Sequence, residues 1–156
     1  MDPLSIAAGV TGLLAFTGTV ISKGYSIASS ISGLQNLTTL LQETTSLSGT
    51  LAGINARLSC PDPNSAVLAK DLEAKIDGCK QVLGEINMLL DKSTKLGRVR
   101  LALRKASFDE EAKGLLSRLE GYRSFFILCL QLQNRLGHPS FLNGKKHISH
   151  LVQFAA

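Results

Sequence analysis

Few residues in this sequence are suited to binding a metal ion. His147 and His150 lie three positions apart, so both imidazoles fall on one face if the segment is helical. No third histidine, cysteine or carboxylate accompanies them closely, whereas a protein zinc site has three or four such ligands. We therefore interpret both as surface histidines, and we expect no metal and no cofactor.

The three cysteines are also poor candidates for chemistry. Cys60, Cys79 and Cys129 are odd in number, widely spaced and embedded in periodic apolar stretches. This pattern supports neither a disulfide framework nor a CxxC metal site. We interpret them as small apolar core residues in a reducing, intracellular setting, with redox chemistry as the lesser alternative.

Motifs for covalent or phosphate chemistry do not occur in the sequence. There is no GxSxG and no P-loop, the serines and threonines lie within helical patterns, and no acidic pair stands apart from solvated faces. We therefore expect a protein that is not an enzyme. A catalytic pocket assembled from distant residues is the alternative that spacing alone does not reveal.

A cluster of positive charge is the strongest binding signal. The stretch from Lys92 to Phe108 has six basic residues and no acidic one, in a chain of net charge +5. Clustered cations attract anionic lipid, and the interleaved Leu96, Val99, Leu101 and Leu103 suit a membrane interface. The predicted anionic-lipid contacts on this basic connector are Lys92, Lys95, Arg98, Arg100, Arg104 and Lys105.

Two other interpretations of the basic connector remain. The first is a solvated, mobile loop, which is a common fate of a charge run. The second is nucleic-acid binding, which we do not expect because the segment has no aromatic side chain for base stacking and no helix-turn-helix or zinc-finger spacing accompanies it.

The segment from Pro3 to Ser22 carries no charged side chain. Asp2 and Pro3 predict a helix start, and about 20 residues suffice to cross the hydrocarbon layer. Apolar groups around most of this helix predict that it is hidden, either in a protein core or in lipid. Its glycines make it a marginal inserter, and no basic region precedes it as in a secretory signal. The predicted membrane-insertion residues are Leu4, Ile6, Val10, Leu13, Leu14, Phe16, Val20 and Ile21.

Three further helices are predicted after a Gly- and Ser-containing stretch from Lys23 to Gly33. Apolar spacing predicts helices over 37–58, 65–91 and 107–136, the last opened by a capping box of Ser107 and Glu110. The apolar run Phe125 to Leu130 predicts that this last helix is the most buried. The sequence thus indicates an all-α, up-and-down bundle over residues 1–136, with four main helices and a tail at 137–156 that adds at most a short fifth helix.

The opening MDPLSIAAGVTGLLAFTGTVIS resembles the start of fungal HeLo-like domains, which precede NACHT or ankyrin regions in intracellular immune-type receptors. The segment Val99 to Leu130, a basic stretch followed by an acidic helix start and a Leu-rich helix, is also similar in pattern to that group. The resemblance spans most of Met1 to Leu136. The segment after Gly137 departs from the family, because it shows no P-loop, ankyrin repeat or amyloid-type repeat.

This resemblance implies a bundle similar to that of the mixed-lineage kinase-like pseudokinase. It implies a cell-death effector that oligomerises under an NLR-type receptor or another downstream domain, moves from the cytoplasm to the plasma membrane and inserts the segment matching Pro3 to Ser22. Together with the residue patterns, it predicts a membrane-targeting, homo-oligomerising effector or signalling domain that binds anionic lipid and not nucleic acid. The alternative is an adaptor bundle that relays oligomerisation to a protein partner without touching lipid.

Overall fold

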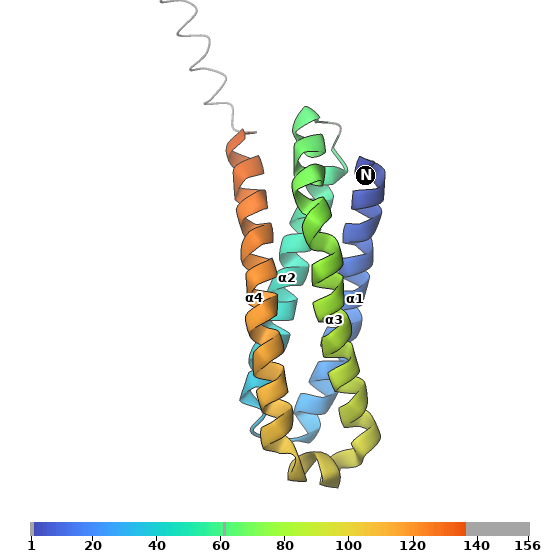
Figure 1. Cartoon of the computed structure of the whole chain (residues 1–156), viewed down its shortest axis with the longest axis vertical. Helices are drawn as coiled ribbons and strands as arrows, with labels where there is room; N and C mark the ends of the chain where they lie inside the picture. The colour runs from blue at the N-terminus through green and yellow to red at the C-terminus, as the bar shows by residue number, and fades with distance from the viewer. Residues whose placement is uncertain (1, 61, 137–156) are drawn as a thin grey trace, which may run out of the picture.

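The computed structural model describes residues 2–60 and 62–136, which form four α-helices. Successive helices run in opposite directions, as Figure 1 shows, so the predicted all-α, up-and-down bundle of four helices is confirmed. The predicted tail, its short fifth helix, His147 and His150 lie outside the described residues. The helices are α1 (Pro3–Ser30), α2 (Gln35–Leu58), α3 (Pro63–Leu103) and α4 (Lys105–Leu136).

The helices do not pack in their chain order. α1 packs against α2 and α3, and α4 packs against the same two helices, whereas α2 and α3 touch each other only slightly. In cross-section α1 and α4 therefore occupy one diagonal, and the short turn from α2 to α3 crosses the other. Each pair of neighbouring helices, such as α3 and α4, therefore meets along a seam on the side of the bundle.

The predicted apolar stripes of α2 and α3 form the core of the bundle. Every predicted stripe position is buried except Leu58, which is half-buried. The predicted stripes are Leu37, Leu40, Thr44, Leu47, Leu51, Ile54 and Leu58 on α2, and Leu68, Leu72, Ile76, Cys79, Leu83, Ile86 and Leu90 on α3. Three buried hydroxyls in this core are satisfied locally, since Thr17, Thr44 and Ser93 donate to backbone carbonyls three or four residues earlier. Burial of these three hydroxyls therefore does not cost stability through unsatisfied hydrogen bonds.

α1 is longer than predicted, because it continues past Ser22 to Ser30. Its buried stripe continues through Gly24 and Ile27, and a Cβ at Gly24 would overlap the side chain of Leu41 on α2. The residues of this stretch, glycine and serines among them, have low intrinsic helix propensity. Packing of Leu41 directly against the α1 backbone at Gly24 helps to keep the stretch helical.

The prediction that a protein core hides most of the circumference of α1 is wrong for the bundle. Its outward face is exposed to solvent and consists, apart from Leu4, of small or hydroxyl-bearing side chains. The outward residues of the first six turns are Ser5, Ala8, Thr11, Gly12, Ala15, Gly18, Thr19 and Ser22.

The prediction that α4 is the most buried helix is also wrong. Within the apolar run only Phe126 and Cys129 are buried, while Leu128 is exposed. α4 lies at a corner of the bundle and contacts two neighbours, so even its run of apolar residues presents one side to water.

The basic connector is helical rather than a loop. α3 bends at Gly97 (φ 72°, ψ 165°) and ends at Leu103, and α4 begins at Lys105. Ser107 therefore lies inside α4, and the predicted capping box does not start that helix. Burial of Leu101 and Phe108 on either side of the junction fixes this tight reversal.

Asp109 caps α2 instead of its own helix. One carboxylate oxygen, Oδ1, accepts hydrogen bonds from the backbone N–H groups of Asn36 (3.1 Å) and Leu37 (3.4 Å). The other, Oδ2, accepts from the Asn36 side-chain amide at 2.9 Å. Leu34 at the N-cap of α2 offers no side-chain acceptor, so a residue distant in sequence supplies it.

The backbone at Gly97 generates the first prediction. Its φ and ψ fall in a region that only glycine adopts without strain, so Gly97→Ala should destabilise the fold by about 1–3 kcal/mol. Gly114→Ala is the matched control, since a Cβ there also meets open space but the backbone is helical; it should stabilise by up to about 1 kcal/mol. Urea denaturation measures both, and equal stabilities of the two variants would contradict the assignment of strain to Gly97.

Candidate functional site

The six predicted lipid-contact residues gather at one end of the bundle, where α3 bends and reverses into α4 (Figure 1). We call this end, formed by residues 92–105, the basic pole. Five of the six basic side chains are exposed and Lys105 is half-buried. The helical structure therefore keeps the charges together, as the sequence predicted, but on a fixed scaffold.

The charges of the basic pole are not neutralised by ion pairs with the part of the chain that the structure describes. The cross-helix ion pairs lie elsewhere: Lys23 with Asp91 (2.9 Å), Arg118 with Glu85 (2.5 Å) and Arg123 with Glu43. The acids that border the pole in sequence are already engaged, because Asp91 holds Lys23 and Asp109 caps α2. A concentrated positive field therefore remains at this end.

Two apolar side chains protrude from the basic pole. Val99 is 76% exposed and Leu103 is 83% exposed, and their spacing of four places them on one side of the last turns of α3. Arg98, Arg100 and Arg104 adjoin them in sequence and are exposed as well. Apolar groups ringed by cations suit the boundary between lipid headgroups and acyl chains.

The tertiary structure sorts the four apolar residues of this segment. Leu101 belongs to the core and Leu96 is half-buried, whereas Val99 and Leu103 face solvent. The sequence offered no means of separating them, because the bend at Gly97 rotates the last turns of α3 relative to the rest of the helix.

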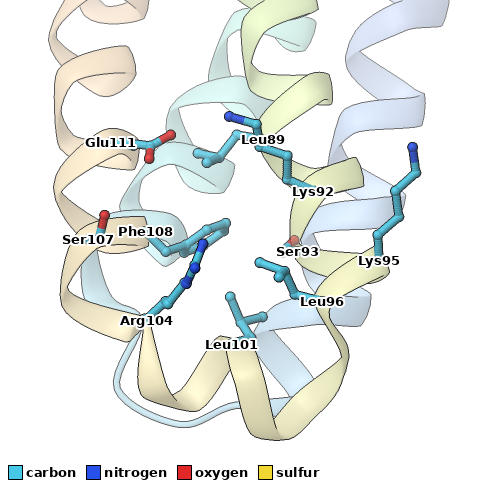
Figure 2. A pocket seen from close by; sticks show the side chains of 10 residues that line it. All are labelled: Leu89, Lys92, Ser93, Lys95, Leu96, Leu101, Arg104, Ser107, Phe108 and Glu111. Atoms are coloured by element: carbon cyan, nitrogen blue, oxygen red, sulfur yellow. The ribbon is translucent and has the colours of Figure 1, made fainter.

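A groove opens beside the basic pole, between α3 and α4, with a volume of about 390 Å³. Figure 2 shows leucine side chains and the ring of Phe108 at its floor and charged side chains around it. Its lining residues from α4, and the groove itself, were not predicted, since they depend on how two helices pack. The residues that line the groove are Leu89, Lys92, Ser93, Lys95, Leu96, Leu101, Arg104, Ser107, Phe108 and Glu111.

The eight predicted membrane-insertion residues divide into three groups in the bundle. Ile6, Val10, Leu13 and Val20 are buried, and Leu4 is 76% exposed. The half-buried group consists of Leu14, Phe16 and Ile21.

α1 presents no uncompensated charge along its length. Its one charged residue, Lys23, donates to Asp91 at 2.9 Å and to the side chain of Asn87 at 2.8 Å. α1 is long and apolar enough to cross a membrane, as the core helix of a soluble protein can also be, and 28% of its apolar 18-residue stretch is buried in the bundle. The helix thus pairs an apolar inner face with an uncharged outer face.

The start of the predicted insertion segment and the basic pole lie at opposite ends of the bundle. α1 begins at the end of the bundle opposite the basic pole, and only its last turn approaches that pole (Figure 1). Its 28 residues span roughly 42 Å at 1.5 Å per residue. Docking of the pole on a surface would therefore leave Leu4 and Ile6 far from it while the bundle remains closed.

The prediction that the three cysteines are core residues is confirmed for two of them and wrong for Cys60. Cys79 and Cys129 are buried, but Cys60 is exposed at the turn after α2, and all three are free thiols. Burial raises the pKa of Cys79 to about 12, and desolvation together with the charge of Asp71 raises the pKa of Cys129. Among the described residues no group of three potential metal ligands occurs.

The chain matches no protein-family model, no curated protein and no solved structure.

The cysteine environments generate the second prediction. A thiol reagent at pH 8 should label one cysteine rapidly in the folded chain and three in denaturant, because the raised pKa values of Cys79 and Cys129 keep these buried thiols protonated. Cys60→Ser should abolish the rapid reaction. Rapid labelling of a second thiol in the folded protein would show that the core is open.

Proposed function

We propose that this chain is a non-catalytic membrane-docking bundle, an effector or signalling domain that meets anionic lipid through its basic pole. The main observation in support is the pair of exposed apolar residues, Val99 and Leu103, which lie among arginines that form no ion pairs with described residues. Each cation near an anionic leaflet contributes about 1 kcal/mol, so the five exposed basic residues together favour docking by several kcal/mol.

In this proposal α1 is the membrane-active element. Release of α1 into water would forfeit roughly 1.5–3 kcal/mol for each of its buried aliphatic side chains. Release into hydrocarbon keeps those side chains away from water, and the outer face brings no charge with it. Lipid is therefore an alternative partner for the face that the bundle covers.

Self-association supplies the trigger in this proposal. The distance between the start of α1 and the basic pole means that docking alone does not deliver α1 to the bilayer. Many copies held together at the membrane, under an NLR-type receptor or a similar assembling domain, raise the local concentration of released helices. The similarity of MDPLSIAAGVTGLLAFTGTVIS to HeLo-like domains supports a role in programmed cell death, with movement from cytoplasm to plasma membrane.

A second candidate function is a protein-binding adaptor that does not touch lipid. One observation favours it: Leu128, Leu132 and Leu136 follow one another at intervals of four along α4, and each is at least half-exposed. An apolar stripe at this spacing suits a partner helix laid in a groove. This stripe lies at the end of the bundle away from the basic pole, so the two functions are separable by mutation.

Docking is tested with vesicles that contain phosphatidylserine. The double variant Arg98→Gln/Arg100→Gln should lower the vesicle affinity measured by cosedimentation about thirtyfold, since two contributions of about 1 kcal/mol are lost. Lys70→Gln/Lys80→Gln, which removes two exposed charges elsewhere on α3, should have little effect. Binding should also weaken with salt, because the screening length falls to about 3 Å at 1 M. Equal losses in the two double variants would refute docking through the basic pole, and failure of the unmodified chain to cosediment would favour the adaptor.

Insertion is tested by leakage of dye from the same vesicles. Val10 and Leu13 are core residues, so a charge there would disrupt the bundle before any membrane step. Ala15→Asp instead places a charge on the exposed face near the middle of α1, where transfer to the bilayer centre costs about 2.5–3.5 kcal/mol. The variant should remain folded and bind vesicles, while leakage falls on the order of a hundredfold.

The matched control for leakage is Ala52→Asp, which introduces the same charge at an exposed position of α2. It should leak dye at the rate of the unmodified chain. If Ala15→Asp also leaks at that rate, with both variants folded by circular dichroism, α1 does not enter the bilayer.

A further inference from the structure

The groove beside the basic pole is one part of a longer channel along the α3–α4 seam. A second hollow of about 380 Å³ continues from it and shares Leu89, Lys92 and Glu111 with it. From Phe108 to Arg118 on α4, the seam extends over roughly 15 Å of helical rise. Each hollow has a volume in the range of small-molecule sites, about 300–1,000 Å³.

The floor of this channel is apolar. Leu89, Leu101 and Phe108 form its base near the basic pole, and Leu115 and Met88 continue it along the seam. Met88 is 64% exposed and lies beside Leu89 and Leu115 in the second hollow, which Glu85, Lys92, Glu111 and Arg118 also line. Gly114 leaves the α4 wall open here, because a Cβ at that position would meet nothing within 4 Å. Covering this floor with an apolar chain would remove hydrocarbon surface from water.

The two ends of the channel differ in charge. Lys95 and Arg104 stand at the end formed by the basic pole, whereas Lys92 and Glu111 line both hollows and therefore lie at their junction. In Figure 2 the Arg104 side chain rises across Phe108 and the Lys92 amine lies close to Leu89, so both cations border the apolar floor. At the other end Glu85 and Arg118 neutralise each other in a two-point ion pair, with distances of 2.5 and 3.1 Å.

We infer that the α3–α4 channel is a binding site for a long-chain fatty acid, taken up as a single molecule from water. The carboxylate lies at Arg104, at the end formed by the basic pole, and the unbranched chain follows the apolar floor past Leu89 toward Leu115. A guanidinium matches a carboxylate in charge and geometry, and a single chain suits an apolar floor with a guanidinium at one end. The inference does not require the membrane role, since it concerns a dissolved ligand in a lateral groove.

The probe is laurate below its micelle concentration, titrated into the whole chain by calorimetry. We expect saturable binding of one laurate per chain. Dodecyltrimethylammonium, which has the same chain length but a cationic head, should bind at least tenfold more weakly, and butyrate, which has the head without the chain, should not bind measurably. Equal affinity for the two twelve-carbon probes, or binding of many laurates without saturation, would overturn the assignment.

Two variants locate the ligand. Arg104→Gln should weaken laurate binding about tenfold through loss of a charged hydrogen bond, whereas Lys80→Gln should not. Gly114→Leu should also weaken it, because the new side chain enters the channel without displacing any protein atom. Circular dichroism establishes that each variant is folded. Laurate affinity unchanged by both Arg104→Gln and Gly114→Leu would place the ligand elsewhere and refute the site.

Measuring vesicle binding of the same variant distinguishes the fatty-acid site from the proposed membrane role. Gly114→Leu lies away from Val99 and Leu103, so it should weaken laurate binding and leave cosedimentation with vesicles unchanged. Failure of laurate to bind a chain that still cosediments with vesicles would refute the channel alone. Laurate binding by a chain that ignores vesicles would support the channel and count against membrane docking.

Discussion

Burial of Leu101 and Phe108 at the junction of α3 and α4 is the packing constraint on which the surface features depend. The two side chains hold the junction against the base of the bundle, and Gly97 supplies the backbone bend that lets Leu101 reach it. Because the bend turns the last part of α3, Val99 and Leu103 point into solvent. The basic pole and the mouth of the channel are thus consequences of one tight reversal.

The charge of the basic pole persists because the acids that flank it in sequence already have other partners. Asp91 holds Lys23, and Asp109 caps α2. These contacts tie α1 to α3 and α2 to α4, so they stabilise the fold, and neither acid forms an ion pair with a cation of the pole. Attraction to an anionic surface therefore comes from exposed cations, which avoid the high cost of a buried unpaired charge.

α1 is compatible with two environments because of its side-chain sizes as much as its hydropathy. The inner face fills the core with aliphatic groups, and the outer face has glycine, alanine, serine and threonine, which are tolerated in water and impose a small cost in lipid. The one charge, Lys23, is near the far end and is held by α3. A helix of this kind is stable in the bundle only through its neighbours, since its own propensity is low.

The sequence by itself determined the helical class, the stripes of α2 and α3, the uncharged start and the position of the basic cluster, because these follow from local periodicity and composition. Tertiary structure decided where helices end, since packing extended α1 to Ser30 and made the basic connector helical. It also decided which apolar residues meet water, separating Leu101 from Leu103, and it created the α3–α4 channel. Those features depend on which helices become neighbours, and this chain crosses the bundle diagonally between α2 and α3, a choice that residue spacing does not encode.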